Sequence, residues 1–221
     1  MERIYVLGTR ASRLALKQVD EALQKIRDVF PTFKCRVVTI DTYGDKDKAT
    51  PISSIEGTDF FTREIDRALL DGIIDLAVHS AKDLPDTMPS GLLCAATTAP
   101  KEPSDALVSR TGATLDALSI GAKIGTSSTR RKTQLKKYRD DFILVDIRGT
   151  IEERLEQLET KGLDAVIIAA CALERLELEH RIAQRIPQTV MATHPLQGAL
   201  AVLIRAGDTE LNRIIAHIHG K

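Results

Sequence analysis

The chain has no tryptophan, and its 221 residues include only three tyrosines and five phenylalanines. So few aromatic side chains leave little to form the stacking platforms that bind single-stranded nucleic acid. Lysine and arginine together number 31, and aspartate and glutamate also number 31, so the formal net charge is zero. Without a basic field to attract phosphates, we expect no nucleic-acid partner.

Long apolar runs are missing as well. No run approaches the roughly 18 residues that cross a bilayer, and the first five residues lack the apolar core of a signal peptide. The three cysteines, Cys35, Cys94 and Cys171, show no metal-ligand spacing. An odd, scattered set of cysteines without an export signal is typical of the reducing cytoplasm. The sequence therefore predicts a cytoplasmic protein without a membrane partner or a metal site.

What the chain does contain is an alternation of strand-like and helix-like segments. Short apolar runs at 4–7, 37–40 and 76–78 alternate with helical spacing at 16–26 and 61–69. A second unit repeats the pattern from about residue 105, with apolar runs at 105–109, 142–147 and 164–169. We therefore predict an α/β protein with mixed, mostly parallel sheets.

The stretch from Leu76 to Pro85 is the centre of this pattern. Leu76-Ala77-Val78 is typical of a buried parallel strand, and Pro85 blocks a helix soon after it. Ser80, Lys82 and Asp83 should then project from the carboxyl end of the strand, where open α/β sheets bind their ligands. A solvated turn is the alternative interpretation, because turns after strands also favour Asp and Lys.

Two similar turns join a strand to a helix. Gly8-Thr9-Arg10 lies in the first half, and residues 125–130 read Gly-Thr-Ser-Ser-Thr-Arg in the second. Ser12 is suited to cap the first helix, and Thr150 with Glu153 forms a capping box further on. Because helix N-termini bind anions, both turns are candidate anion sites. The echo between the halves suggests two lobes with a cleft between them.

Charged residues gather at the predicted strand-to-helix turns. They are Arg10, Lys82, Asp83, Arg130, Arg131, Arg148, Arg154 and Arg175. The rigid fork of arginine suits bidentate binding of carboxylates, so the set predicts a polyanionic ligand. A lone carboxylate among these cations, Asp83, would hold a cationic group or stabilise positive charge that develops in a transition state. Taken singly, each arginine is also consistent with an ordinary surface residue.

Other chemistries have no signature. The chain contains neither G-x-x-x-x-G-K-[ST] nor G-x-G-x-x-G for nucleotides, and no G-x-S-x-G elbow. His79 is the only histidine near the predicted site, and we expect a structural role for it. The remaining histidines, His180, His194, His217 and His219, form no recognisable metal set.

Five segments resemble the hydroxymethylbilane synthases, also called porphobilinogen deaminases. They read Ile-Tyr-Val-Leu-Gly-Thr-Arg-Ala-Ser-Arg-Leu-Ala-Leu, Asp-Leu-Ala-Val-His-Ser-Ala-Lys-Asp-Leu-Pro, Gly-Thr-Ser-Ser-Thr-Arg-Arg, Ile-Arg-Gly-Thr-Ile-Glu-Glu-Arg-Leu and Leu-Gln-Gly-Ala-Leu-Ala. The motifs occur in family order and span nearly all of the chain. His-Ser-x-Lys-Asp-x-Pro is close to diagnostic.

The resemblance implies an enzyme of tetrapyrrole and haem biosynthesis. Members join four porphobilinogen molecules head to tail, release ammonia, and then hydrolyse off hydroxymethylbilane. They have two lobes like periplasmic binding proteins around a central cleft, here expected as residues 1–97 plus 195–221 and residues 98–194. The implied partners are porphobilinogen and the growing polypyrrole, and we expect a monomer.

The resemblance also assigns roles to residues. Asp83, with its neighbour Lys82, would match the catalytic position, where the aspartate contacts pyrrole nitrogens and stabilises the azafulvene cation. Arginines would bind the acetate and propionate groups, and other polar residues would support the site. The implied binding residues are Arg10, Ser12, Ser80, Thr126, Ser128, Arg130, Arg131, Arg148, Arg154, Arg175 and Gln197.

Three departures from the family pattern concern its dipyrromethane cofactor. The chain stops at Lys221, about where the family's third domain and its cysteine anchor would begin, so we expect that domain to be absent, as in the short chlamydial members. The family's Gly-Gly-Lys-Gly-Leu-Phe loop reads Glu56-Gly57-Thr58-Asp59-Phe60-Phe61 and lacks the lysine. The usual Gly-Gln-Gly reads Leu196-Gln197-Gly198.

Two functions from different classes follow. The first is an active hydroxymethylbilane synthase that holds dipyrromethane noncovalently or on an unusual cysteine, for which Cys171 is the candidate. The second is a catalytically impaired two-lobed protein that binds pyrrole carboxylates or another polyanion. The retained Asp83 and arginines favour the enzyme, whereas the missing anchor favours the binder. A truncated chain is a third interpretation that the sequence leaves open.

Overall fold

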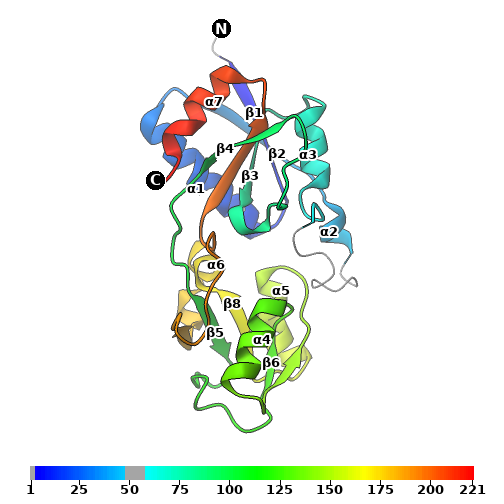
Figure 1. Ribbon diagram of the computed structural model, residues 1–221, viewed down its shortest axis with the longest axis vertical. Helices are drawn as coiled ribbons and strands as arrows, with labels where there is room; N and C mark the ends of the chain where they lie inside the picture. Colours follow the sequence, from blue (N-terminus) through cyan, green and yellow to red (C-terminus); the bar gives the residue numbers. More distant parts are fainter. Residues whose placement is uncertain (1–2, 48–57) are drawn as a thin grey trace. The chain divides into compact units, whose positions relative to one another are not determined.

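The computed structural model describes residues 3–47 and 58–221. These residues form two compact units. The first takes in the described parts of residues 1–47, 57–101 and 198–221, and the second comprises residues 102–197. Each unit is built on a five-stranded sheet with helices packed against it (Figure 1). The lobe boundaries expected from the sequence stay a prediction.

The sheet of the first unit has the strand order β2-β1-β3-β10-β4. Its strands are β1 (Ile4–Thr9), β2 (Lys34–Thr39), β3 (Leu76–Ser80), β4 (Leu92–Thr97) and β10 (Leu200–Arg205). Strand β1 runs parallel to both β2 and β3, whereas β10 runs antiparallel to β3 and β4. The carboxyl ends of β1, β2 and β3 therefore meet at one edge of the sheet.

Helices cover both faces of this sheet. They are α1 (Arg13–Val29), α2 (Tyr43–Lys46), α3 (Arg63–Leu70) and α7 (Thr209–Ile215), with short 3-10 turns η2 (Ala81–Asp83) and η4 (Ala216–Ile218). The helices α1 and α7 share a core with alternate residues of β1, β3 and β10, such as Leu7, Val78 and Val202. Ala77 and Leu203 point to the opposite face and pack with α3. The central strands β3 and β10 are buried on both sides, which explains why they are nearly continuously apolar.

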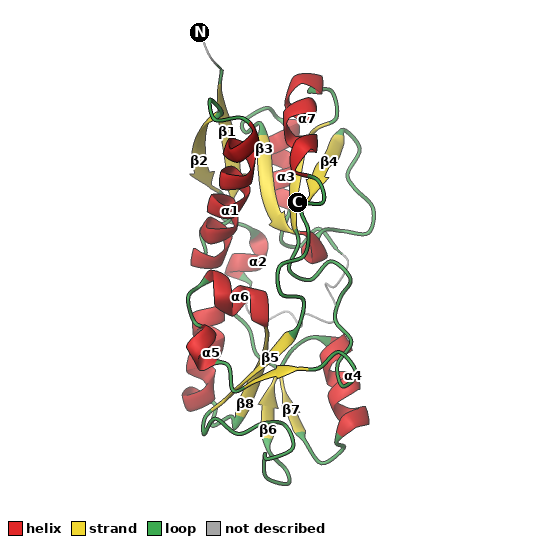
Figure 2. Ribbon diagram, turned by 90° about the vertical axis from the view of Figure 1, so that its left-hand side faces the viewer, coloured by secondary structure: helices red, strands yellow, loops and turns green. Residues whose placement is uncertain are grey.

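The second unit repeats this plan. Its sheet has the order β7-β6-β8-β5-β9, with β5 (Asp105–Ser109), β6 (Lys123–Gly125), β7 (Ile143–Val145), β8 (Ala165–Ala169) and β9 (Gln184–Ile186). Its helices are α4 (Thr129–Tyr138), α5 (Ile151–Thr160) and α6 (Ala170–Arg175), with the turn η3 (Glu179–Arg181). Helices α4 and α5 lie on opposite sides of the sheet (Figure 2). Strand β6 is parallel to β7 and β8, and β5 is antiparallel to β8 and β9.

The expected α/β class is confirmed, and the sheets are mixed. Each sheet contains two parallel and two antiparallel pairings, because β10 in the first unit and β5 in the second run against their neighbours. The predicted Ser12 cap and the Thr150–Glu153 capping box are both present, at α1 and α5. Local hydrogen bonding thus fixes where these two helices begin.

Some local features differ from the sequence expectation. Helix α3 begins at Arg63 and not at Phe61, because the Phe61 ring packs against α2 and Arg10. Residues 43–46 form α2 because Thr42 and Asp45 make a second capping box. Strand β9 was not expected, since its sequence Gln-Arg-Ile has no apolar pattern. Within the described ranges, no helix is long and apolar enough to cross a membrane.

Candidate active site

The carboxyl end of β3 carries Ser80, Lys82 and Asp83, as the sequence predicts. Lys82 and Asp83 lie in η2, directly after the strand, with Lys82 half-buried and Asp83 exposed. Leu84 ends this turn in an extended conformation, as the following Pro85 requires. Ser80 accepts a 2.8 Å hydrogen bond from Nε2 of Gln18 on α1. The strand therefore presents a lysine and a carboxylate at the sheet edge, above a serine held from the helix.

Arg10 lies at the carboxyl end of the adjacent strand β1. Its Nε donates to both carboxylate oxygens of Asp45, at 3.0 and 3.2 Å, and its NH2 group also donates to that carboxylate. The guanidinium carbon stands 4.9 Å from the centre of the Phe61 ring, a cation–π contact. Burial alone would raise the pKa of Asp45, but the hydrogen bonds and charge of Arg10 outweigh it and lower the pKa. Arg10 is thus fixed on two sides before any ligand arrives.

His79 is buried beneath this edge. It is 7% exposed, and its Nε2 has no hydrogen-bond partner among the described residues. Burial, with a smaller contribution from the charge of Arg10, lowers the pKa of His79 to about 4. The imidazole is therefore neutral at physiological pH, which fits the structural role expected from the sequence.

In the second unit, the N-terminus of α4 carries two hydroxyl residues that were expected to bind a ligand. Ser128 is its N-cap, and its hydroxyl makes no capping bond within the described chain. Thr126 is 1% exposed, and its hydroxyl has no hydrogen-bond partner among the described residues. Unpaired backbone N–H groups and the helix dipole attract negative charge at such a terminus. This local geometry is what a carboxylate ligand requires.

Arg130 and Arg131 lie in the first turn of α4, and both bind one carboxylate. Arg130 donates to Asp105 Oδ2 at 2.7 Å and Arg131 to Asp105 Oδ1 at 2.6 Å. Arg131 is 7% exposed and also donates to the Ile167 carbonyl. Arg130 is more exposed and also donates to the Ala192 carbonyl. The two guanidinium groups are therefore held in fixed orientations from within the unit.

The remaining predicted arginines follow β7 and β8. Arg148 lies in the turn after β7, where Ser127 exchanges hydrogen bonds of 2.6 and 2.8 Å with the backbone of Ile147. Arg154, on α5, donates from Nε to the Gly149 carbonyl at 2.9 Å. Arg175 ends α6 and is buried. All three belong to elements that begin at the carboxyl ends of their strands.

The predicted residues thus form two groups, one in each unit. Arg10, Ser12, Ser80, Lys82 and Asp83 lie in the first unit, and Thr126, Ser128, Arg130, Arg131, Arg148, Arg154, Arg175, Gln197 and Cys171 lie in the second. Except for Gln197, the residues of each unit follow parallel strands whose carboxyl ends share an edge. Ser12 caps α1 through its hydroxyl, which accepts from the Ala15 amide.

Gln197 and Cys171 are both buried. Gln197 is fully buried, and its Nε2 donates to the carbonyls of Pro103 and Ser104 and to Asp105 Oδ1. Cys171 is 4% exposed on α6, just after β8. Cys35 is a poor nucleophile, because burial raises the pKa of its thiol to about 11.

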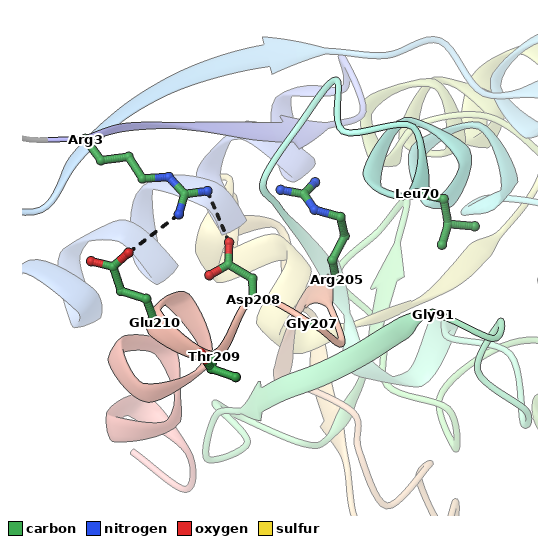
Figure 3. A pocket seen from close by; sticks show the side chains of 8 residues that line it. All are labelled: Arg3, Leu70, Gly91, Arg205, Gly207, Asp208, Thr209 and Glu210. Carbon is green, nitrogen blue, oxygen red and sulfur yellow. Dashed lines mark hydrogen bonds and ion pairs between the residues drawn. The ribbon is translucent and has the colours of Figure 1, made fainter.

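A separate open pocket lies near the start of β1 and the end of β10 in the first unit. Figure 3 shows Arg3 in ion pairs with Asp208 and Glu210 beside Arg205 and Leu70, around a volume of about 560 Å³. None of the predicted site residues lines it. We assign it no part in the chemistry below.

Known proteins resemble the chain along nearly its whole length. The family described as "Porphobilinogen deaminase, dipyromethane cofactor binding domain" matches residues 5–213. Porphobilinogen deaminase of Moorella thermoacetica is 43% identical over 96% of this chain and 68% of its own length. That of Paenibacillus macerans is 39% identical over 97% of this chain and 68% of its own length.

The chain belongs to the porphobilinogen deaminase family. This assignment makes it a transferase with hydroxymethylbilane synthase function in tetrapyrrole biosynthesis, and it does not favour the binding-protein alternative. A dipyrromethane cofactor is part of the family description.

Solved structures support the two-lobed fold of this chain. The methionine-binding protein MetQ superposes with a TM-score of 0.57 at 12% identity, over 97% of this chain and 89% of its own. The periplasmic VFT2 domain of BvgS from Bordetella pertussis gives a TM-score of 0.54 at 15% identity, over 97% and 86%. The expected architecture of periplasmic-binding-protein-like lobes is confirmed.

Three residues of the site escaped the sequence analysis. Asp45 clamps Arg10, Gln18 holds Ser80, and Asp105 binds both arginines of α4. The capping-box spacing from Thr42 to Asp45 was a readable signal. By contrast, 62 positions separate Gln18 from Ser80, and 26 positions separate Asp105 from Arg131. Of the altered Glu56–Phe61 loop, Glu56 and Gly57 lie outside the described residues.

Proposed function

We propose that this chain joins porphobilinogen molecules head to tail into hydroxymethylbilane, with Asp83 as the catalytic carboxylate. The observation that carries the proposal is the exposed Asp83 carboxylate at the carboxyl end of β3. It directly follows Lys82, and Arg10 follows the parallel strand β1 at the same edge of the sheet. A carboxylate beside cations is of little use for binding an anionic substrate. It is of use where positive charge develops.

The chemistry of the substrate gives Asp83 its role. Cleavage of the C–N bond of the protonated porphobilinogen aminomethyl group releases ammonia and leaves the positive charge on an azafulvene cation. The α-carbon of a second pyrrole then forms the new C–C bond, and the proton on that carbon is lost. A fixed carboxylate at the pyrrole nitrogen stabilises the cation, whose charge reaches that nitrogen, more than the substrate, whose charge lies on the ammonium group, and this lowers the barrier.

The arginines would bind the acetate and propionate groups of the pyrroles. Arg10 is already oriented by Asp45 and Phe61, and Arg130 and Arg131 are oriented by Asp105. Preoriented guanidinium groups lose little entropy on binding a carboxylate. Arg148, Arg154 and Arg175, with Ser12, Ser80 and Lys82, would complete the binding set, and Lys82 would also offset the charge of Asp83.

The residues at the α4 N-terminus fit a dipyrromethane cofactor with its carboxylates. The buried Thr126 hydroxyl lacks a partner among the described residues, and the Ser128 hydroxyl makes no capping bond there, so both are available as donors. The group would supply a nucleophilic pyrrole carbon from which the product chain grows. We propose that Thr126, Ser128, Arg130 and Arg131 hold its carboxylates.

The three thiols in this chain differ little in their suitability for covalent attachment of the cofactor. Cys35 has its thiol pKa raised to about 11, Cys94 is half-buried and donates to the Ala96 carbonyl, and Cys171 is buried. Thiolates form covalent bonds more readily when they are exposed and have a low pKa. We therefore propose that these two units hold dipyrromethane by ion pairs and hydrogen bonds, with Cys171 as the alternative attachment point.

Two further features are proposed from the sequence. The scattered free cysteines support a reducing, cytoplasmic location. A monomer is the expected state, and size-exclusion chromatography with light scattering measures it directly.

Replacement of Asp83 by asparagine tests the proposed function. D83N keeps the shape of the side chain but loses its charge, so we expect kcat for porphobilinogen to fall by about 10² to 10³-fold while the melting temperature is unchanged. Asp86 is the matched control, because it is an exposed aspartate three positions further along the same loop. D86N should turn over like the parent chain. Normal turnover by D83N would remove Asp83 from the mechanism.

A further inference from the structure

Asp105 is a buried carboxylate that accepts hydrogen bonds from three side chains of the second unit. It stands at the first position of β5 and its side chain has no exposed surface. Arg130 and Arg131 donate to its two oxygens from α4 at 2.7 and 2.6 Å, and Gln197 donates to Oδ1 at 2.9 Å from the segment before β10. Burial alone would raise the pKa of Asp105, but the charges and hydrogen bonds of both arginines outweigh it and lower the pKa.

Gln197 binds Asp105 and the backbone just before it. Its single amide nitrogen also donates to the carbonyls of Pro103 and Ser104, the two residues before Asp105. The next residue, Gly198, has a φ of +94°, and a Cβ there would lie 2.1 Å from the Lys101 carbonyl oxygen. The segments 101–105 and 197–198 are therefore in close contact. Each contains a point at which the chain changes from one unit to the other. A side chain buried in this way supports Asp105 and is not exposed to a ligand.

We propose that Asp105 is the positioning residue of the carboxylate site at α4, and that Gln197 acts through it. The claim deepens the proposed function and rests on it. Asp105 accepts from the NH2 groups of Arg130 and Arg131, which fixes the planes of both guanidinium groups. It also reduces the repulsion between two adjacent cations. Without it, both side chains would have to be ordered by the substrate, at the expense of affinity.

The test is the substitution Asp105→Asn with separate measurement of kcat and KM for porphobilinogen. We expect KM to rise by about tenfold or more, as befits the loss of a charge-assisted hydrogen bond, while kcat of the folded enzyme changes little. A purely structural role would lower the amount of active enzyme, and hence apparent kcat, without raising KM. Unchanged KM in a folded D105N enzyme would overturn the proposal.

Asp75 supplies a matched control. Its carboxylate also accepts from two arginines, Arg3 and Arg205, and from a third donor, the Val6 amide, but it lies at the opposite end of β3 from Asp83. D75N should lower the melting temperature and leave KM unchanged. An equal rise of KM in D75N and D105N would also overturn the proposal, because the effect would then follow from any lost ion pair.

Gln197→Met keeps the test open if D105N does not fold. Methionine fills a similar volume but donates no hydrogen bond, so the KM of Q197M should rise by about threefold. Where D105N does fold, adding Q197M to it should raise KM no further. Q197M with unaltered KM would overturn the role of Gln197. Absence of turnover by the unsubstituted chain would instead overturn the proposed function, so the two failures are distinct.

Discussion

At the scale of single residues, three arginines of the proposed site are held by other groups of the chain. Asp45 and Phe61 hold Arg10, and Asp105 holds Arg130 and Arg131. Each carboxylate costs some positive charge at the site but fixes a flexible side chain with about 2 kcal/mol of rotamer entropy. Asp83 differs from Asp45 and Asp105, because it is exposed and directly follows Lys82 in the sequence.

His79 gives a residue-scale prediction about pH. Its pKa is lowered to about 4 by burial and, to a smaller extent, by Arg10. In the unfolded chain the pKa is near 6.5. Between pH 6.5 and 4 the unfolded chain therefore binds a proton that the folded chain does not, so the free energy of unfolding falls as the pH falls. The contribution lost by pH 4 is on the order of 3 kcal/mol.

Urea unfolding between pH 7 and 4.5 measures this effect. His79→Leu removes the titrating group, so the free energy of unfolding of H79L should depend less steeply on pH than that of the parent chain. Parallel pH profiles for the two proteins would show that His79 is accessible to protons in the folded state.

At the scale of elements, the short helix α2 depends on a glycine. A Cβ at Gly44 would lie 2.4 Å from Cδ1 of Phe61 and 2.9 Å from Cδ1 of Phe60. The two rings are in edge contact with each other, and Tyr43 in turn contacts Phe60. Gly44 therefore lets the aromatic cluster of Tyr43, Phe60 and Phe61 lie on α2, with the Phe61 face under Arg10.

Gly44→Ala is the corresponding prediction. The added methyl group must displace the Phe61 ring, so we expect the first unit to lose about 1–3 kcal/mol of stability and KM to rise because Arg10 loses its support. Denaturant unfolding and steady-state kinetics measure the two effects. Gly207→Ala is the control, since no heavy atom lies within 4 Å of a Cβ there and its stability should change by less than about 0.5 kcal/mol. Equal stability of G44A and G207A would refute the packing argument.

Local signals in the sequence predicted some of these elements, and tertiary contacts decide the others. The Ser12 cap and the Thr150–Glu153 box were readable because each links residues three positions apart. Strand β9 and the start of α3 were not, because tertiary contacts decide them. Asp105 resembled any residue at the start of an apolar strand, and only the fold brings it to Arg131, 26 positions away. Gln197 was expected at a ligand, whereas it is fully buried against Asp105.

At the scale of the whole molecule, two units with the same sheet plan each contribute one group of polar residues. The first brings a carboxylate for positive charge, and the second brings a helix N-terminus and arginines for negative charge. In the proposed function, the first group would stabilise developing positive charge and the second would bind carboxylates. This division explains why the polar residues are spread along the chain from Arg10 to Arg175.

Cofactor retention is a prediction at the same scale. If ion pairs and hydrogen bonds hold dipyrromethane, the chain incubated with porphobilinogen should carry pyrrole mass in native mass spectrometry and lose it under denaturing conditions. The substitution R131Q should lower the retained fraction, because Arg131 is buried beside the α4 N-terminus. A denaturation-resistant adduct that maps to Cys171 would replace ion pairing with covalent attachment.

The most direct test of the central claim is the release of ammonia from porphobilinogen by the purified chain. The account predicts one ammonia for each porphobilinogen consumed, together with a tetrapyrrole that cyclises on acidification, and loss of both signals in D83N. Porphobilinogen that binds tightly without ammonia release would contradict the account and would make the protein a binder of pyrrole carboxylates.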